Sequence, residues 1–388
     1  MAALVWWFLS VAGSAGAGGV LQRQGLDLVK IAVTLTGGVG GVVVLVVAYR
    51  KQRLGEVAER REAAASRRDE LKLFTERYVK AAEQLGNAAA TVRLVGVHAM
   101  ADLADEWAER RQTCVNVLCG HVRMYFDPEP PGDPAELRMW RGERQVRGTV
   151  FRVVAERLRD DAPVSWQGCD FDFTGAVIDG ADFHSIVVSE GTVSFERAVF
   201  PSGLVDFDGA VLSGGVVDFS RAVVSGGEIR LGCVKLEGSV LHFHEMDLCG
   251  GQLAFDFARL SAGCVNLDDI NARDGRLSFY CTEVSGANVS FSGSEFSGAE
   301  VSFRGAKFLS GNLAFGDCVL ARGTVCFDEA KFAGGYVGVH RSRHEGGVFD
   351  FSNPGSWDRP PVFTSTRREQ AVEGVRLPGT ALTSTTPA

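Results

Sequence analysis

The stretch FERAVFPSGLVDF, from Phe195 to Phe207, contains one full repeat of the pattern that decides the fold. Its first and last phenylalanines are separated by one 12-residue period, and an apolar residue returns at this interval at fifteen successive positions. A period sustained over so many copies is the signature of a solenoid, in which stacked coils share one core. The column runs Phe171, Phe183, Phe195, Phe207, Phe219, Leu231, Phe243, Phe255, Leu267, Phe279, Phe291, Phe303, Phe315, Phe327 and Val339.

Each repeat contains two apolar pairs, in the order Val-x-Phe and Ala-x-Phe. Residues two apart in an extended segment point to the same face, so we expect both pairs to face the interior of a coil. Glycine precedes many of these pairs, where a tight corner requires a positive φ. These glycines are Gly203, Gly215, Gly227, Gly251, Gly263, Gly275, Gly311, Gly323 and Gly335.

The repeat predicts a parallel β-solenoid over residues 166–350. Either two repeats together form one four-sided coil, or a single repeat forms a flatter coil. We favour the first arrangement because it leaves more interior for two large side chains per repeat. The predicted core ladder is Phe195, Phe207, Phe219, Phe243, Phe255, Phe279, Phe291, Phe303, Phe315 and Phe327.

Two uncharged segments precede the repeats, at residues 1–21 and 31–49. Each has about the 20 residues that a helix needs to cross a bilayer. A basic cluster, Arg50–Arg53, follows the second segment, and the positive-inside bias assigns that end to the cytoplasm. We therefore expect a helical hairpin in the cell membrane, with residues 22–30 as its outer loop and the C-terminal domain in the cytoplasm.

Two alternatives remain open for this region. The second half of residues 1–21 is mostly Gly, Ala and Ser, so a single span at 31–49 is one alternative. A cleaved signal peptide is the other, although this segment lacks the basic start of such peptides. Gly37 and Gly41 form a small-xxx-small pair that would let two membrane helices pack closely, or they simply fill one helix.

The segment between these spans and the repeats predicts helices. Residues 50–72 are dense in Ala, Glu, Arg and Lys and predict a charged helical linker. Apolar residues at helical spacing then predict a helical module over residues 73–160, and the prolines from Pro128 to Pro134 predict a loop inside it. The expected helices are residues 54–83, 88–107, 109–125 and 143–159.

Three stretches of the helical module, at residues 76–86, 92–104 and 111–123, read ERYVKAAEQLG, VRLVGVHAMADLA and RQTCVNVLCGHVR. Together with the repeats, they resemble the membrane-tethered pentapeptide-repeat-containing proteins of actinobacteria. The Ala-x-Phe halves, best seen in residues 171–183, resemble the five-residue repeat that builds a right-handed quadrilateral β-helix. Later repeats are spaced five plus seven, which departs from that pattern. The resemblance implies an architecture and no established reaction.

Charge is distributed unevenly along the chain. The formal net charge is −8, but residues 166–350 contain 25 acidic and 13 basic residues, a net charge of −12. Some soluble pentapeptide-repeat proteins mimic duplex DNA with an acidic rod and inhibit topoisomerases, so the resemblance implies such a regulator as an alternative function.

The nine cysteines are irregularly spaced, which predicts reduced thiols rather than a disulfide framework.

Few residue groups suggest chemistry. Two surface histidines without a fixed third ligand are more often solvated than metal-bound, and adjacent aspartates on a strand point to opposite faces. Two cysteines five apart on a helix most simply pack as small hydrophobes. We therefore predict no catalytic, cofactor or metal site. The groups considered are His242, His244 and Glu245; His340 and His344; Asp268 and Asp269; and Cys114 and Cys119.

The sequence thus predicts a mixed α and β chain with separate modules: transmembrane helices, a small helical domain and a right-handed parallel β-solenoid. Residues 351–388 are expected to form a cap and a disordered tail. The expected function is a non-enzymatic, membrane-anchored scaffold or protein-interaction protein. Its expected partners are the lipid bilayer and an unidentified protein, without a cofactor, a small-molecule substrate or direct nucleic-acid binding. A membrane signal sensor is a further alternative.

Overall fold

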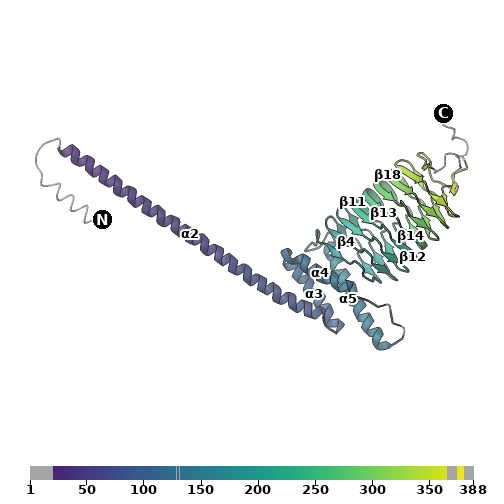
Figure 1. Ribbon diagram of the computed structural model, residues 1–388, viewed down its shortest axis with the longest axis horizontal. Coiled ribbons are helices and arrows are strands. Elements are labelled where there is room, and N and C mark those ends of the chain that lie inside the picture. Colours follow the sequence, from purple (N-terminus) through teal and green to yellow (C-terminus); the bar gives the residue numbers. More distant parts are fainter. Residues whose placement is uncertain (1–20, 128, 131, 365–373, 380–388) are drawn as a thin grey trace. The chain divides into compact units, whose positions relative to one another are not determined.

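A computed structural model describes residues 21–127, 129–130, 132–364 and 374–379 of the chain (Figure 1). The chain divides into two units, Met1–Thr75 and Glu76–Ala388. The second unit contains a small group of helices followed by a β-solenoid. This order confirms the predicted succession of helical and solenoid parts.

Helix α2 runs without interruption from Leu21 to Leu85. The predicted outer loop at residues 22–30 is therefore wrong, because this segment contains no proline and continues the helix. No helix among the described residues is long and apolar enough to cross a membrane. The predicted span at residues 31–49 thus finds no support in the structure, and the other predicted span, 1–21, lies almost wholly outside the described residues.

The helices of the second unit pack around a small apolar core. Their buried side chains include Val97 and Met100 from α3, Leu118 from α4, and Val150 and Val154 from α5. Burial of one face of each helix is what the helical spacing of apolar residues predicts. These elements are α3 (Ala90–Glu106), the 3₁₀ helix η1 (Ala108–Arg110), α4 (Arg111–Arg123) and α5 (Pro134–Leu158).

Helix α5 begins well before the start that the sequence predicted, at Pro134 rather than Glu143. The Asp133 side chain accepts a hydrogen bond from the Ala135 backbone N–H at 2.8 Å and caps the helix. Pro134 occupies the first turn, where its missing N–H costs nothing because that group has no partner inside the helix. The sequence analysis assigned Pro134 to the preceding loop, whereas in the structure it is the first residue of the helix.

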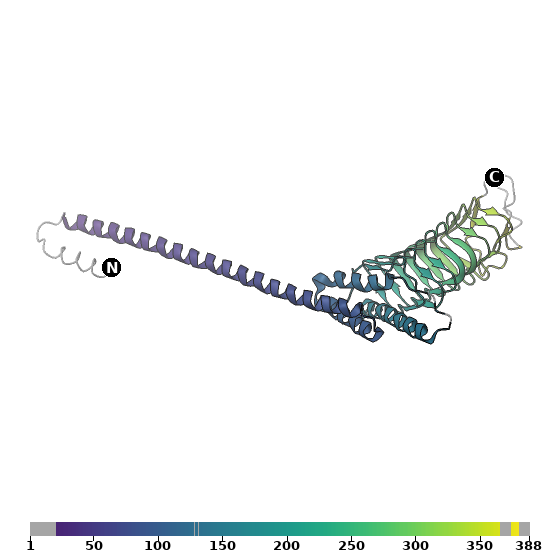
Figure 2. The same cartoon turned by 60° about the horizontal axis from the view of Figure 1, so that its bottom comes forward.

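The solenoid consists of two long parallel sheets whose strands stack along the rod (Figure 2). The first sheet contains β1 (Phe171–Asp172), β3 (Val187–Val188), β4 (Thr192–Ser194), β7 (Val211–Leu212), β8 (Val216–Asp218), β11 (Lys235–His242), β13 (Arg259–Asn266), β15 (Glu283–Ser290), β18 (Lys307–Gly316), β21 (Lys331–Phe332), β22 (Tyr336–His340) and β25 (Val362–Thr364). The second contains β2 (Ala181–Asp182), β5 (Val199–Phe200), β6 (Leu204–Asp206), β9 (Val223–Val224), β10 (Glu228–Arg230), β12 (Asp247–Ala254), β14 (Asn271–Ser278), β16 (Glu295–Phe296), β17 (Glu300–Ser302), β19 (Val319–Leu320), β20 (Thr324–Cys326), β23 (Arg343–His344), β24 (Val348–Asp350) and β26 (Val375–Arg376).

The pairing register gives the length of a coil. Val217 pairs with Val193 on one side and with Leu241 on the other, so neighbouring coils are offset by two repeats. Each coil therefore contains two 12-residue repeats and contributes one to each sheet. This excludes the alternative of one repeat per coil.

The first coil is slightly shorter than the others, because Phe171 pairs with Val193. Phe173, not Phe171, then stacks on Phe195, with ring centroids 5.3 Å apart. The sequence column placed Phe171 in the phenylalanine register, but it occupies the valine register of the later repeats. A strict 12-residue count cannot reveal this offset, since both residues are phenylalanine.

All ten phenylalanines of the predicted core ladder are buried, with exposed fractions of 2% or less. Rings two repeats apart stack face to face, as between Phe219 and Phe243, whose centroids are 5.2 Å apart. Rings one repeat apart meet edge to face, as between Phe243 and Phe255 at 5.7 Å and 77°. The core is therefore two stacked columns in edge-to-face contact, a geometry that aromatic quadrupoles favour.

Positive φ recurs at two corners of the repeat, always at the second and in many repeats at the first. The predicted glycine corner has a positive φ at Gly203 and Gly263, among others, but Gly227 and Gly251 lack one. A second corner lies between the Phe and Ala of each repeat, where Arg221 has φ +59°. Glycine occupies this corner at Gly209, Gly293 and Gly305, but the sequence does not mark it clearly because Ser, Arg, Cys, Glu, Phe and Asp also occur there. The non-glycine residues there are Ser185, Arg197, Arg221, Cys233, Glu245, Phe257, Asp269, Cys281, Asp317, Glu329 and Arg341.

Both ends of the solenoid core are covered. At the first coil, Phe151 of α5 packs against Phe173 and Phe183, with centroids 5.1 and 5.8 Å away. At the other end, Trp357 packs against Phe332 at 5.2 Å. Part of the predicted disordered tail is ordered, since β26 pairs with β24. The rest of that tail, residues 365–373 and 380–388, lies outside the described residues.

All nine cysteines are free thiols. Burial raises the pKa of Cys114 to about 11 and that of Cys119 and Cys318 to about 12. Cys233 is exposed, although burial of part of its surface and the nearby Asp208 raise its pKa. The thiolate is the reactive form of cysteine, so low solvent access and the raised pKa both protect Cys114, Cys119 and Cys318.

We expect a maleimide reagent at pH 8 to modify Cys233 first in the native chain. Cys114, Cys119 and Cys318 should react only after unfolding, as read by peptide mass spectrometry over a time course. A Cys233→Ser variant should lose the fastest phase and keep the others. Rapid modification of Cys119 in the folded protein would contradict the buried position described above.

Candidate functional site

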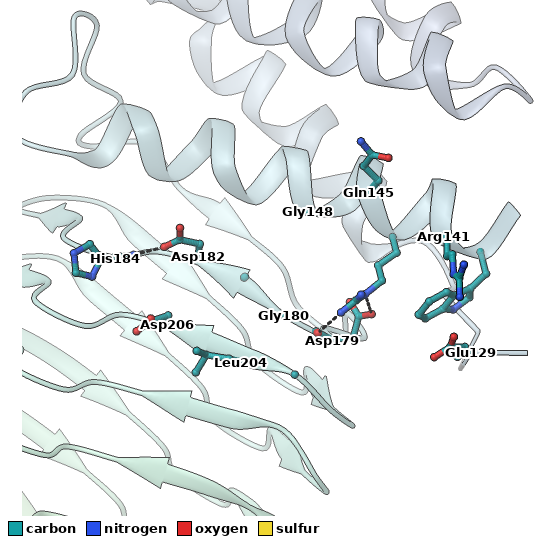
Figure 3. A pocket seen from close by; sticks show the side chains of 14 residues that line it. Glu129, Arg141, Gln145, Gly148, Asp179, Gly180, Asp182, His184, Leu204 and Asp206 are labelled. Atoms are coloured by element: carbon teal, nitrogen blue, oxygen red, sulfur yellow. Dashed lines mark hydrogen bonds and ion pairs between the residues drawn. The ribbon is translucent and has the colours of Figure 1, made fainter. Parts of the chain in front are cut away.

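A groove of about 940 Å³ lies between α5 and the first coils (Figure 3). Arg141 and Arg144 of α5 line one side. Asp179, Asp182 and Asp206 line the side formed by the coils. The groove therefore carries charges of both signs.

Arg144 and Asp179 form an ion pair across the groove. The Arg144 Nε lies 2.5 Å from an Asp179 carboxylate oxygen, and its Nη2 donates to the Asp179 carbonyl at 3.4 Å. The guanidinium also lies 5.6 Å from the centre of the Trp140 ring. This cation therefore joins α5 to the first coil.

Two of the three aspartates of the groove accept backbone hydrogen bonds within the coil turns. Asp182 accepts a hydrogen bond from the His184 N–H at 2.9 Å, and Asp206 accepts one from the Asp208 N–H at 3.0 Å. The same bond recurs at Asp218, which accepts from the Ser220 N–H at 2.8 Å. Aspartate at this position acts as an Asx turn, so its recurrence has a structural cause.

A partly buried charge cluster lies within the helical module. Glu143 contacts His121 at 3.2 Å and Arg93 at 3.0 Å. Burial alone would raise the pKa of Glu143, but His121 and Arg93 outweigh it and lower this pKa. Arg147 is also buried; it donates to the Val177 carbonyl at 2.7 Å and lies 4.6 Å from the Phe126 ring centre. The cluster connects the helices to the first coil.

Three of the residues considered for chemistry, His244, Glu245 and Asp269, lie close together. His244 lies 3.3 Å from Glu245 and 3.6 Å from Asp269, while His242 lies on strand β11. Among the residues that the structure describes, no group of three or more His, Cys, Asp or Glu side chains could hold a metal ion. The Asp268 carboxylate accepts hydrogen bonds from the Ser290 hydroxyl and the Ser292 backbone N–H of the next coil.

His340 and His344 each contact a residue close to them in the sequence. His340 contacts the Tyr336 hydroxyl, and the His344 Nδ1 lies 3.4 Å from the Gly347 carbonyl. Gly37 and Gly41 lie on α2, with nothing within 4 Å of an added Cβ. Close packing of two copies of this helix stays a prediction.

The outer surface of the solenoid follows a rule that the sequence did not reveal. Arginines pair with carboxylates one coil away, as Arg221 does with Glu245 at 2.6 Å and Arg276 with Glu300 at 2.8 Å. Residues two repeats apart become neighbours only when the coil length is known. The net charge of −12 over residues 166–350 is therefore interspersed with cations rather than presented as a uniform acidic surface.

A family model described as pentapeptide repeats in nine copies matches residues 173–223. This match covers the first coils and supports the β-solenoid. No curated protein and no solved structure matches the chain. The resemblance of the helical module to membrane-tethered proteins stays a prediction, because the matched residues begin after it.

Proposed function

We propose that this chain is a non-enzymatic scaffold or protein-interaction protein whose solenoid binds a protein partner. The observation that carries the proposal is the division of the repeat into constant inward positions and variable outward ones. The inward column is almost entirely Phe or Leu, whereas its outward neighbours include Glu196, Ser220, His244 and Tyr280. Solenoids of this kind provide long regular surfaces for binding.

The described polar groups support this proposal. The three aspartates that line the groove are used in turns and an ion pair, and no nucleophile lies beside a base among the residues described there. The buried thiols have raised pKa values, which disfavours nucleophilic chemistry at Cys114 and Cys119. A partner-binding role needs none of these groups to react.

Attachment to the cell membrane is the second part of the proposal and rests on the sequence alone. Residues 1–21 and 31–49 are uncharged, and Arg50–Arg53 would mark the cytoplasmic side. A lipid bilayer would then be a further partner, and the solenoid would be displayed in the cytoplasm. The sensor alternative adds a signal passing through the helices, for which the structure offers no specific support.

The alternative of an acidic rod that mimics duplex DNA is weaker. Such a mimic needs a dense field of one sign, because phosphates carry one charge about every 1.7 Å along a duplex. Here Arg221, Arg230 and Arg273 neutralise neighbouring carboxylates in place. We therefore do not expect the chain to inhibit topoisomerases.

Photo-crosslinking in cells tests the proposal with the full-length chain. A photoreactive amino acid is placed at Leu309 or Arg322 on the solenoid, or at Met139 on α5 as the matched control; all three positions are exposed. We expect discrete protein adducts from the solenoid positions and not from the control. Separating membrane from soluble fractions before analysis shows whether the adducts are at the membrane. Absence of adducts at both solenoid positions would refute the proposed partner binding.

A further inference from the structure

One outward column of the first sheet is mostly cationic. Strand pairing aligns Lys235 with Arg259, then Glu283, Lys307 and Lys331 in successive coils. All four cations are exposed, while the next residue in each strand, such as Leu236 or Leu260, is buried. We name Lys235, Arg259, Lys307 and Lys331 the cationic stripe.

The charges of the cationic stripe are available to a partner. Elsewhere on the solenoid, arginines such as Arg273 and Arg304 pair with carboxylates of an adjacent coil. In the stripe, Lys307 lies 3.8 Å from Glu283, and no described carboxylate forms an ion pair with the other three cations. A row of mostly uncompensated cations on a rod of net charge −12 is a local reversal of sign.

The residues beside the cationic stripe do not cancel its charge. Two positions further along each coil, the outward residues are Glu237, Ser261, Ser285, Leu309 and Ala333, of which one is acidic. Leu309 is 44% exposed. The strip of surface along the stripe is therefore basic and partly apolar.

An exposed aromatic pair lies at the corner next to the cationic stripe. Phe257 comes two residues before Arg259 and is 54% exposed, and Tyr280 is 40% exposed. Their rings meet edge to face, with centroids 5.3 Å apart. Phe257 also has φ +59°, which is unfavourable for a bulky side chain. Exposed aromatic residues beside arginine are the groups that most often dominate binding at protein interfaces.

We propose that the cationic stripe binds an extended acidic segment of a partner polypeptide, with Phe257 and Tyr280 as an apolar anchor. Coils stack about 4.8 Å apart, so the stripe spans about 19 Å over four coil steps. In an extended segment, alternate side chains are about 6.7 Å apart, and four of them span about 20 Å. Four alternating carboxylates thus match the length of the stripe.

The same geometry favours a polypeptide over a nucleic acid. The stripe is one residue wide, so it offers cations along a line and none across it. A nucleic acid brings phosphates over a wider surface, where they would meet the carboxylates that give the solenoid its net charge of −12. A short acidic segment would contact the cationic stripe without contacting those carboxylates. This inference rests on the proposed function and names the surface and the partner class.

Fluorescence anisotropy with the full-length chain tests the inference. The probe is a labelled peptide in which Glu and Thr alternate four times; a peptide of alternating Lys and Thr and a single-stranded oligonucleotide are the comparison probes. The test variant combines Lys235→Glu, Arg259→Glu and Lys331→Glu. Its matched control combines Arg322→Glu, Arg343→Glu and Arg359→Glu, which are exposed cations outside the stripe with the same change of charge.

We expect the acidic peptide to bind the unmodified chain and the control, and its affinity for the test variant to fall at least about tenfold. Binding should weaken as salt rises, since exposed ion pairs are screened. Phe257→Ala should also weaken binding without changing the salt dependence. Equal binding to the test variant, or tighter stripe-dependent binding of the oligonucleotide, would overturn the inference.

The crosslinking experiment distinguishes a failure of the cationic stripe as the binding surface from a failure of the proposed function. If adducts at the solenoid persist in the test variant, the proposed function stands and the cationic stripe is not its binding surface. If the unmodified chain gives no solenoid adducts at all, the proposed function itself fails, whatever the peptide shows.

Discussion

Replacing Phe303 with alanine should lower the free energy of unfolding by about 3 to 5 kcal/mol, because it opens a cavity in the middle of the stacked rings. Phe303 lies between Phe279 and Phe327, with centroids 4.6 and 4.9 Å away and nearly parallel planes. Its edges also meet Phe291 and Phe315. Urea denaturation followed by circular dichroism measures the change.

Phe257→Ala is the matched control for this prediction. It removes the same atoms from a ring that is 54% exposed, so the expected loss is within about 1 kcal/mol. The two variants thus separate the core ring from the surface ring. Equal losses in both would contradict the two-column core.

Replacing Gly263 with alanine should destabilise the solenoid by about 2 to 4 kcal/mol, although it adds a single carbon. Gly263 has φ +92°, and an added Cβ would lie 2.2 Å from the Ser239 carbonyl oxygen of the previous coil. That atom belongs to the backbone and cannot move without separating β11 from β13. Thermal unfolding gives the change in midpoint.

The identical substitution at Gly148 serves as the control. Gly148 lies inside α5 with nothing within 4 Å of an added Cβ, so alanine there should stabilise the chain by up to about 1 kcal/mol. Opposite signs are therefore expected for two Gly→Ala changes. A neutral Gly263→Ala variant would show that the coils can separate at this corner without cost.

The groove between α5 and the first coils contains charged residues that have structural rather than binding roles. Within it, Arg144 connects the helix to the coil and Asp182 closes a turn. The candidate surface for binding lies instead on the outer side of the first sheet. A flat surface of this kind is consistent with a protein partner and does not require a cavity.

The 12-residue repeat by itself determined the fold class and the buried positions. Each coil must bury the same positions against its neighbours, so apolar residues recur at a fixed period in the sequence, as from Phe195 to Phe327. Helix boundaries were less predictable, because Pro134 fits both a loop and the first turn of a helix. The length of α2 through residues 22–30 was also missed, since apolar and charged segments can share one helix.

Only the tertiary structure decided how many repeats make a coil. A coil of one repeat and a coil of two place the same phenylalanines inside, and the choice depends on which distant strand accepts each backbone hydrogen bond. The second positive-φ corner, the ion pairs between coils and the cationic stripe all depend on that choice. Lys235 and Arg259 are distant in the sequence, and they are neighbours because one full coil separates them.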